Sequence, residues 1–74
     1  MSLFVKSLTG RVLIITIHEN MTIIDVKEQI QMYDGIDISQ IRLIYEGKLL
    51  NDTLKVDESF DKKTMHMVLA LRGG

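Results

Sequence analysis

The sequence predicts an α+β domain in which one main helix packs across a mixed β-sheet. The prediction rests on the order of the segments: a hairpin with strand periodicity, then a segment with helix periodicity, then short strands and a long last strand. The chain has 74 residues and no cysteine, so it forms one small domain that packing alone has to stabilise.

The opening hairpin is predicted from residues that alternate between apolar and other side chains. Gly10 can supply the turn, because glycine adopts positive φ without strain. The segment from residue 11 to residue 18 is rich in β-branched residues and is expected to be the partner strand. The residues expected to face the core are Leu3, Val5, Leu13, Ile15 and Ile17. The residues expected on the outer face of the second strand are Val12, Ile14 and Thr16, which is an unusually apolar set.

A helix is predicted to begin at Thr22 and to end near Gly35. Thr22 can cap the helix, and the Asp25 side chain can bond back to it in a short version of the capping box. Gly35 can end the helix in a left-handed conformation. The residues expected on the buried helical face are Ile23, Val26 and Ile30.

Residues 41–45, 48–50 and 65–71 are predicted strands, and residues 51–63 a polar, irregular segment. Leu43 is expected to face opposite to Arg42 and Ile44. The buried anchors expected in the irregular segment are Leu54, Val56 and Phe60. In the last strand, Met65, Met67 and Leu69 are expected to share one face, and His66, Val68 and Ala70 the other. The first and last strands are expected to be neighbours.

The composition argues against several classes of function. A net charge of −1 gives no concentrated basic surface for nucleic acid. No apolar run approaches the roughly 20 residues that span a bilayer, and the first residues do not form a signal peptide. His18 and His66 have no third ligand nearby in the sequence, so no metal site is expected. No serine or cysteine nucleophile has a matching base, so the chain is not expected to be an enzyme.

Stretches along the whole chain resemble the ubiquitin family. They are Phe4-Val5-Lys6, Leu8-Thr9-Gly10, Asp34-Gly35-Ile36, Gln40, Arg42-Leu43-Ile44-Tyr45, Gly47-Lys48, Asp52, His66 and Leu71-Arg72-Gly73-Gly74. The resemblance implies a β-grasp fold with a mixed five-stranded sheet. It also implies that residues 1–70 form the domain and that residues 71–74 form a flexible conjugation tail.

Within that family, Ala70, Tyr45 and Asn51-Asp52 resemble the related-to-ubiquitin modifier used in neddylation. Ubiquitin carries arginine at the position of Ala70. The resemblance implies that activating enzymes read Ala70, Leu71 and Arg72, and that an arginine at position 70 is repelled by a basic residue of the neddylation enzyme.

The resemblance further implies how the chain is used. The carboxylate of Gly74, in a processed, conjugation-ready form, is activated as an adenylate, passed on as a thioester and joined to a lysine. Gly73 and Gly74 suit a narrow enzyme channel because they lack Cβ atoms. The implied partners are activating and conjugating enzymes, ligases, processing proteases, ubiquitin-binding domains and cullin-type targets. The chain itself needs no cofactor, since the activating enzyme binds the ATP. A monomer in cytoplasm and nucleus is expected.

Two apolar surfaces are predicted to bind partners. The first, the Ile44 patch, consists of Leu8, Ile44, His66 and Val68; outward apolar residues that cluster usually mark a partner surface. The second, the Ile36 patch, consists of Ile36, Leu69 and Leu71. Lys48 matches the main chain-linkage lysine of the family. Lys27 is interpreted as structural and is expected to pair with Asp52.

Three other readings stay open: a divergent ubiquitin that forms degradative chains, a non-conjugated ubiquitin-like domain of an adaptor protein, and a sulfur carrier. Arg72 and the Ile44 patch argue against the sulfur carrier. The sequence also departs from the family pattern. Two residues are missing between Val56 and Met65, and Ser59 or Phe60 lies nearest to a tyrosine that usually braces this loop.

Overall fold

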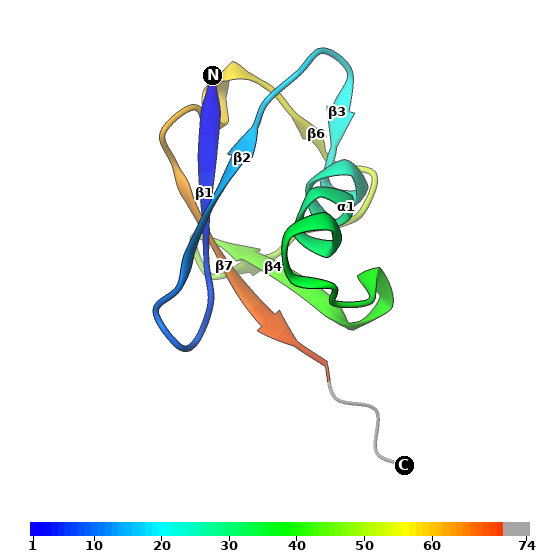
Figure 1. The fold of residues 1–74 in the computed structure, drawn as a ribbon. Coiled ribbons are helices and arrows are strands. Elements are labelled where there is room, and N and C mark those ends of the chain that lie inside the picture. Colours follow the sequence, from blue (N-terminus) through cyan, green and yellow to red (C-terminus); the bar gives the residue numbers. More distant parts are fainter. Residues whose placement is uncertain (71–74) are drawn as a thin grey trace.

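The structure is a computed structural model that describes residues 1–70. The predicted tail, residues 71–74, lies outside the described residues. Along the chain the elements are β1 (Ser2–Lys6), β2 (Val12–Thr16), β3 (Met21–Thr22), α1 (Ile23–Asp34), η1 (Ile38–Gln40), β4 (Ile41–Tyr45), β5 (Lys48–Leu49), β6 (Lys55–Val56), η2 (Glu58–Phe60) and β7 (Thr64–Leu69) (Figure 1).

A five-stranded sheet in the order β2-β1-β7-β4-β5 forms one layer, and α1 packs across one of its faces (Figure 1). β1 and β7 are parallel neighbours, with Val5 opposite Met65, while the other pairs in this sheet are antiparallel. The mixed sheet, the single main helix and the pairing of the first and last strands are therefore confirmed.

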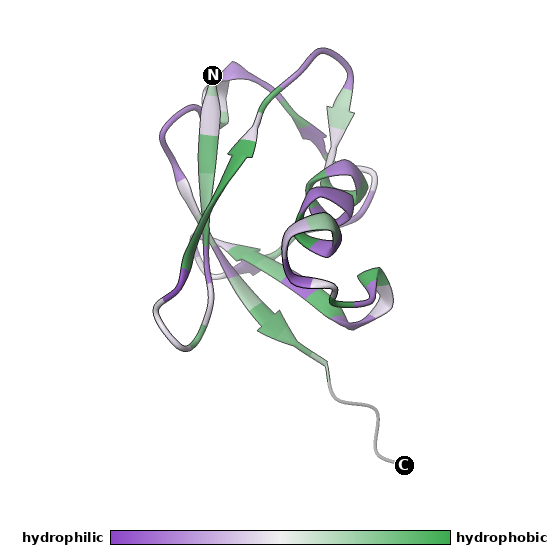
Figure 2. Cartoon of the chain, in the orientation of Figure 1, coloured by the Kyte–Doolittle hydropathy of each residue, from purple (hydrophilic) through white to green (hydrophobic). Residues whose placement is uncertain are grey.

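The core lies between the sheet and α1. Its buried apolar residues are Leu3, Val5, Leu13, Ile15, Ile17, Met21, Ile23, Val26, Ile30, Ile41, Leu43, Val56, Met65 and Met67. In Figure 2 the hydrophobic stretches run along the strands, while the helix also carries hydrophilic residues. Each fully buried aliphatic side chain contributes about 1.5–3 kcal/mol, so this core can stabilise the domain without a disulfide.

The ends of α1 are fixed much as the sequence predicts. The backbone N–H of Thr22 donates to Oδ2 of Asp25 over 2.9 Å, and the Thr22 hydroxyl donates to the same oxygen over 3.3 Å. At the other end Gly35 has φ 68°, and its N–H donates to the carbonyl of Gln31 over 2.7 Å. A side chain with a Cβ is strained at this φ, which explains the glycine.

The turn at residues 51–54 closes the first turn of α1. The N–H groups of Ile23 and Ile24 donate to the carbonyls of Leu54 and Asp52, so two helix donors that lack a helical partner are satisfied. Leu54 therefore serves through its backbone, and its side chain is 39% exposed. The prediction that Leu54 is a buried anchor was wrong, whereas Val56 is buried as predicted and Phe60 packs partly buried against the core.

Lys27 is the buried charged residue of the described chain, at 5% exposure. Its Nζ lies 2.5 Å from Oδ1 of Asp52, whose side chain is half-exposed. This ion pair was predicted from the sequence. It ties the middle of α1 to the turn that also covers the start of the helix.

The segment from residue 51 to residue 63 is more regular than predicted. β6 pairs with β3 in a small second sheet, with Val56 opposite Met21. Asp57 begins η2, because its Oδ1 accepts from the backbone N–H of Ser59 at 2.9 Å and from the Ser59 hydroxyl at 2.6 Å. The ring of Phe60 meets the ring of Tyr45 edge to face, with centroids 5.2 Å apart. Phe60 thus braces the shortened loop.

Three strands have bounds that differ from the prediction. β2 runs from Val12 to Thr16, so it is shorter than residues 11–18, and β5 ends at Leu49, one residue earlier than predicted. The described part of the last strand, β7, runs from Thr64 to Leu69. Leu69 keeps the facing of Met65 and Met67 but is 40% exposed. Leu69 lies at the end of β7, beside a cavity open to solvent, so it shares the facing of the core residues without being buried.

Candidate partner-binding surfaces

The centre of the predicted Ile44 patch is set by the pairing of β4 with β7. Ile44 lies directly opposite His66, and Arg42 lies directly opposite Val68. Directly opposed residues of an antiparallel pair point to the same face, and here that face is the one away from α1. Ile44 and Val68 are half-buried, and His66 is exposed. The structure therefore brings these three predicted residues together.

Leu49 belongs to the same surface and was not predicted. It lies opposite Ile44 in the pairing of β4 with β5, and it is 62% exposed. The turn of Glu46 and Gly47 has two positive φ angles, 50° and 77°, as the tight two-residue hairpin turn requires. A two-residue turn fixes the register, so the Glu46-Gly47 signal in the sequence could have identified Leu49.

Leu8 takes a different position from the rest of the predicted Ile44 patch. It lies in the turn between β1 and β2 and is 84% exposed. Together with Ile36, Met67 and Leu69, it lines a cavity of about 430 Å³. The structure thus places Leu8 beside the Ile36 patch, at the opposite side of β7 from Ile44.

The Ile36 patch is built where α1 ends and β7 ends. Ile36 follows the helix terminus and packs half-buried against the core, and Leu69 comes from the last position of β7. Arg11 and Asp34 also line this cavity, and their ion pair joins Nη2 to Oδ1 over 2.8 Å. Leu71, the third predicted member, lies outside the described residues.

Ala70 is fixed to the body of the domain at the last described position. Its backbone N–H donates to the carbonyl of Gln40 over 2.7 Å, and the residue is half-buried. This bond continues the pairing of β7 with β4, so Ala70 lies on the same outward face as Val68 and Arg42. The other predicted recognition and conjugation residues, Leu71, Arg72, Gly73 and Gly74, lie outside the described residues.

A family model described as the ubiquitin family matches residues 3–72. The chain belongs to the ubiquitin family. It is 38% identical over 72 residues to the NEDD8-like protein RUB1 of Saccharomyces cerevisiae, covering 95% of this chain and 94% of that protein. It is 42% identical over 73 residues to ubiquitin-like protein 1 of Schizosaccharomyces pombe, covering 95% and 92%. It is 40% identical over 72 residues to the ubiquitin-like protein NEDD8 of Dictyostelium discoideum, covering 95% and 94%.

Membership of the ubiquitin family confirms the β-grasp fold that the resemblance implied. The relatives also bear out the resemblance to NEDD8-type modifiers, because two of these three names refer to NEDD8. The match extends over nearly the full length of each of them. The roles of single surface residues remain predictions.

Lys48, the residue that matches the linkage lysine of the ubiquitin family, is exposed on β5 opposite Tyr45. Lys27 differs from it, because burial and the Asp52 carboxylate hold its amine in place. The structure therefore separates an accessible lysine from a structural one.

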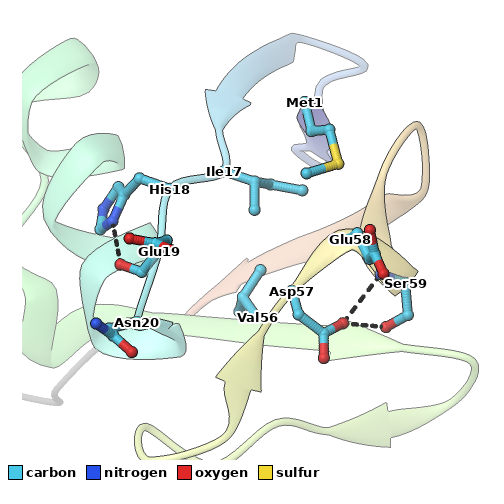
Figure 3. A pocket seen from close by; sticks show the side chains of 9 residues that line it. All are labelled: Met1, Ile17, His18, Glu19, Asn20, Val56, Asp57, Glu58 and Ser59. Atoms are coloured by element: carbon cyan, nitrogen blue, oxygen red, sulfur yellow. Dashed lines mark hydrogen bonds between the residues drawn. The ribbon is translucent and has the colours of Figure 1, made fainter.

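A further cavity of about 580 Å³ contains none of the predicted site residues. Figure 3 shows Ile17 and Val56 near the middle of its lining, with His18, Glu19 and Asn20 on one side and Asp57, Glu58 and Ser59 on the other. The hydroxyl and the backbone N–H of Ser59 hold the pKa of Asp57 below its ordinary value.

Within residues 1–70, no three potential ligands gather into a metal site. In the same part of the chain, no helix is long and apolar enough to cross a membrane.

Proposed function

We propose that this chain is a protein modifier of the neddylation type, joined through Gly74 to lysines of target proteins, with cullin-type scaffolds as the target class. An activating enzyme uses ATP to convert the free carboxylate of Gly74 into an acyl adenylate and releases pyrophosphate. A cysteine thiolate of that enzyme then displaces AMP and forms a thioester. After transfer to a conjugating enzyme, a lysine amine displaces the thiol and forms the isopeptide bond.

The observation that carries this proposal is the position of Ala70. It is held by Gln40 on the outward face of the sheet, and Leu71-Arg72-Gly73-Gly74 follows it directly. A methyl group there presents no charge to a receiving enzyme. An arginine would place a long cation at the same fixed point, unfavourable against a basic surface and favourable against an acidic one.

The Ile44 patch supplies the second half of the proposal. Ile44, Val68 and Leu49 offer apolar surface around His66, away from the core. We propose that conjugating enzymes, ligases, processing proteases and ubiquitin-binding domains dock here, and that the Ile36 patch adds a smaller contact. A few well-packed residues near the centre of an interface usually carry most of its binding energy.

In this proposal the chain is a substrate of other enzymes and catalyses nothing itself. It binds no cofactor, because the activating enzyme binds the ATP. It acts as a monomer in cytoplasm and nucleus, and its partners are proteins, not nucleic acid or membranes.

A divergent ubiquitin that forms degradative chains is the second candidate. The exposed Lys48 favours it, since chain formation needs an accessible amine. Replacement of Lys48 by arginine keeps the charge and removes the nucleophile. Loss of all conjugate ladders in this variant would favour the second candidate, whereas unchanged single conjugates on targets favour the first.

Deletion of Gly73 and Gly74 tests the mechanism. We expect the shortened chain to unfold at the same denaturant concentration as the full chain and to form no thioester with any conjugating enzyme. A matched control replaces Thr64, which is exposed at the first position of β7, by alanine. Continued thioester formation by the shortened chain would contradict the proposal.

A further inference from the structure

Ser39 is an exposed residue in the turn between α1 and β4. It is the middle residue of η1, and its backbone N–H donates to Oδ1 of Asp37 over 3.0 Å. The hydroxyls that form hydrogen bonds within residues 1–70 belong to Ser7, Thr9, Thr22 and Ser59. In the described part of the chain, the Ser39 hydroxyl is therefore not engaged and is accessible to an enzyme from solvent.

A guanidinium group lies beside this turn. Nη1 of Arg42, the second residue of β4, is 3.5 Å from the carbonyl oxygen of Ser39, and both residues are exposed. At this distance the neutral carbonyl is a weak partner, so the guanidinium is available to a stronger acceptor. A phosphate is such an acceptor, because its oxygens match the planar fork of N–H donors in arginine.

The turn of η2 is built alike, yet it suits a phosphate poorly. Oδ1 of Asp57 accepts from the backbone N–H of Ser59 over 2.9 Å and also from its hydroxyl over 2.6 Å. A phosphate on Ser59 would give up the hydroxyl bond and meet a carboxylate. In η1 the Asp37 carboxylate accepts the backbone bond alone, and Arg42 offers a positive charge that offsets it. The same local motif therefore favours a phosphate in η1 and opposes one in η2.

The turn of η1 adjoins the point where the tail leaves the domain. The carbonyl of Gln40, next to Ser39, accepts from the N–H of Ala70 over 2.7 Å. Arg42 lies opposite Val68 and hence diagonally from Ala70. A phosphate carries about −1.5 to −2 charges at neutral pH. On Ser39 it would make the surface around the exit of the tail more negative.

We propose that Ser39 is a phosphorylation site and that Arg42 holds the phosphate beside the exit of the tail. A protein kinase supplies the phosphoryl group from ATP. The Ser39 oxygen attacks the γ-phosphorus, the bond from that phosphorus to the β-phosphate oxygen breaks, and ADP leaves. The hydroxyl proton passes to a base of the kinase.

The consequence of this modification for activation rests on the proposed function. Negative charge at the exit of the tail is attracted by a basic enzyme surface and repelled by an acidic one. Phosphorylation of Ser39 therefore acts in the direction opposite to an arginine at position 70. It strengthens the preference for the neddylation enzyme over the ubiquitin enzyme.

Mass spectrometry tests the site on the natural protein. Trypsin cuts after Lys27 and Arg42 and releases residues 28–42, in which Ser39 is the single serine or threonine. The chain is purified, with phosphatase inhibitors present, from the cells that express it. We expect this peptide to carry a phosphate that fragmentation places on Ser39. A peptide that is found only unmodified, or modified on Tyr33, would overturn the proposal.

Phosphorus NMR tests the contact with Arg42. The full chain is made by chemical synthesis with phosphoserine at position 39 or, as a matched control, at position 59. The second pKa of phosphoserine is ordinarily about 6. Attraction by the guanidinium should lower this pKa at position 39 by about half a unit relative to position 59. In the chain modified at position 39, Arg42→Gln should remove the decrease, whereas Lys55→Gln, which removes a positive charge elsewhere, should keep it.

Thioester assays test the effect on activation. They use the Ala70→Arg background, where the added cation is expected to admit the ubiquitin enzyme. Phosphate at position 39 should slow charging by that enzyme about tenfold, while phosphate at position 59 should leave the rate within about threefold. Charging by neither enzyme in any form would contradict the proposed function alone, because the mass spectrometry and the titration do not depend on it.

Two further results would overturn the inference. One is a phosphate pKa at position 39 that equals the value at position 59 and does not respond to Arg42→Gln. The other is an equal rate of charging by the ubiquitin enzyme with and without phosphate at position 39. The dispersion of the amide spectrum shows that each synthetic chain is folded.

Discussion

The backbone N–H of Ala70 donates a hydrogen bond to the carbonyl of Gln40 over 2.7 Å. This bond extends the ladder between β7 and β4 past the last residue of β7. It places Ala70 diagonally from Arg42 on the outward face. The chain therefore leaves the domain from a fixed point, and the side chain at position 70 has a defined direction.

Ala70→Arg should change which enzyme activates the chain. The new cation would lie near Arg42, so both positive charges would meet the enzyme surface together. A basic surface would repel the variant, and an acidic surface would attract it. We expect slower thioester formation by the neddylation activating enzyme and faster formation by the ubiquitin enzyme. A difference of about 1.4 kcal/mol changes the preference tenfold. Thr64→Arg adds the same charge elsewhere on β7 and should change neither rate.

Ile44→Ala should weaken the binding of a conjugating enzyme by about 1–2 kcal/mol, as expected for a central apolar anchor. The free energy of unfolding should change little, because Ile44 lies on the face away from the core. Titration calorimetry and denaturant unfolding measure the two quantities. Val12→Ala shortens an outward side chain on another strand and serves as control. A large loss of stability with intact binding would show that Ile44 is a core residue.

Asp52→Ala should destabilise the fold by about 1–2 kcal/mol, because it leaves the buried ammonium group of Lys27 without its partner. The half-exposed position of Asp52 keeps the loss below that of a fully buried pair. Lys27→Met keeps most of the apolar stem and removes the charge, so it should cost less than Lys27→Ala. Chemical unfolding measures all three, with Glu19→Ala as an exposed control. Equal stability of Asp52→Ala and the unchanged chain would show that the ion pair contributes nothing.

Acid should destabilise the domain through Asp25 and Asp57. The backbone N–H of Thr22 is the main cause that holds the pKa of Asp25 below its ordinary value of 3.8, and the Ser59 hydroxyl does the same for Asp57. A carboxyl group with a lower pKa in the folded state stabilises the fold above its unfolded pKa. That contribution is lost as the pH falls through the folded value.

Unfolding free energies measured at stepped pH should therefore begin to decline once the pH falls to about one unit above the ordinary carboxyl pKa of 3.8. In Asp25→Asn the decline should be shallower, whereas Glu19→Gln should follow the unchanged chain. Parallel curves for Asp25→Asn and the unchanged chain would count against the helix-start hydrogen bonds as the cause.

Much of the fold could be predicted because local patterns determine it. Alternation identified the core faces of β1 and β2, and the spacing of Ile23, Val26 and Ile30 identified the buried face of α1. Gly35 stands directly after α1, where the backbone takes the left-handed conformation that ends the helix. These features depend on neighbours in the sequence, so they are visible without the tertiary structure.

The misses have tertiary causes. Leu54 is apolar, yet its carbonyl and not its side chain supports α1, which no periodicity reveals. Leu49 lies beside Ile44 because a tight turn sets the register between β4 and β5. The contact of Gln29 with the edge of β2 joins residues 13 positions apart, and the composition gives no sign of it.

The most direct test of the central claim compares how fast the unchanged chain is charged by each of two purified activating enzymes. Equal concentrations of this chain are mixed with ATP and either the neddylation enzyme or the ubiquitin enzyme, and the thioester is followed on non-reducing gels. We predict rapid thioester formation with the neddylation enzyme and little with the ubiquitin enzyme. Efficient charging by the ubiquitin enzyme, with none by the neddylation enzyme, would contradict the account and identify a divergent ubiquitin.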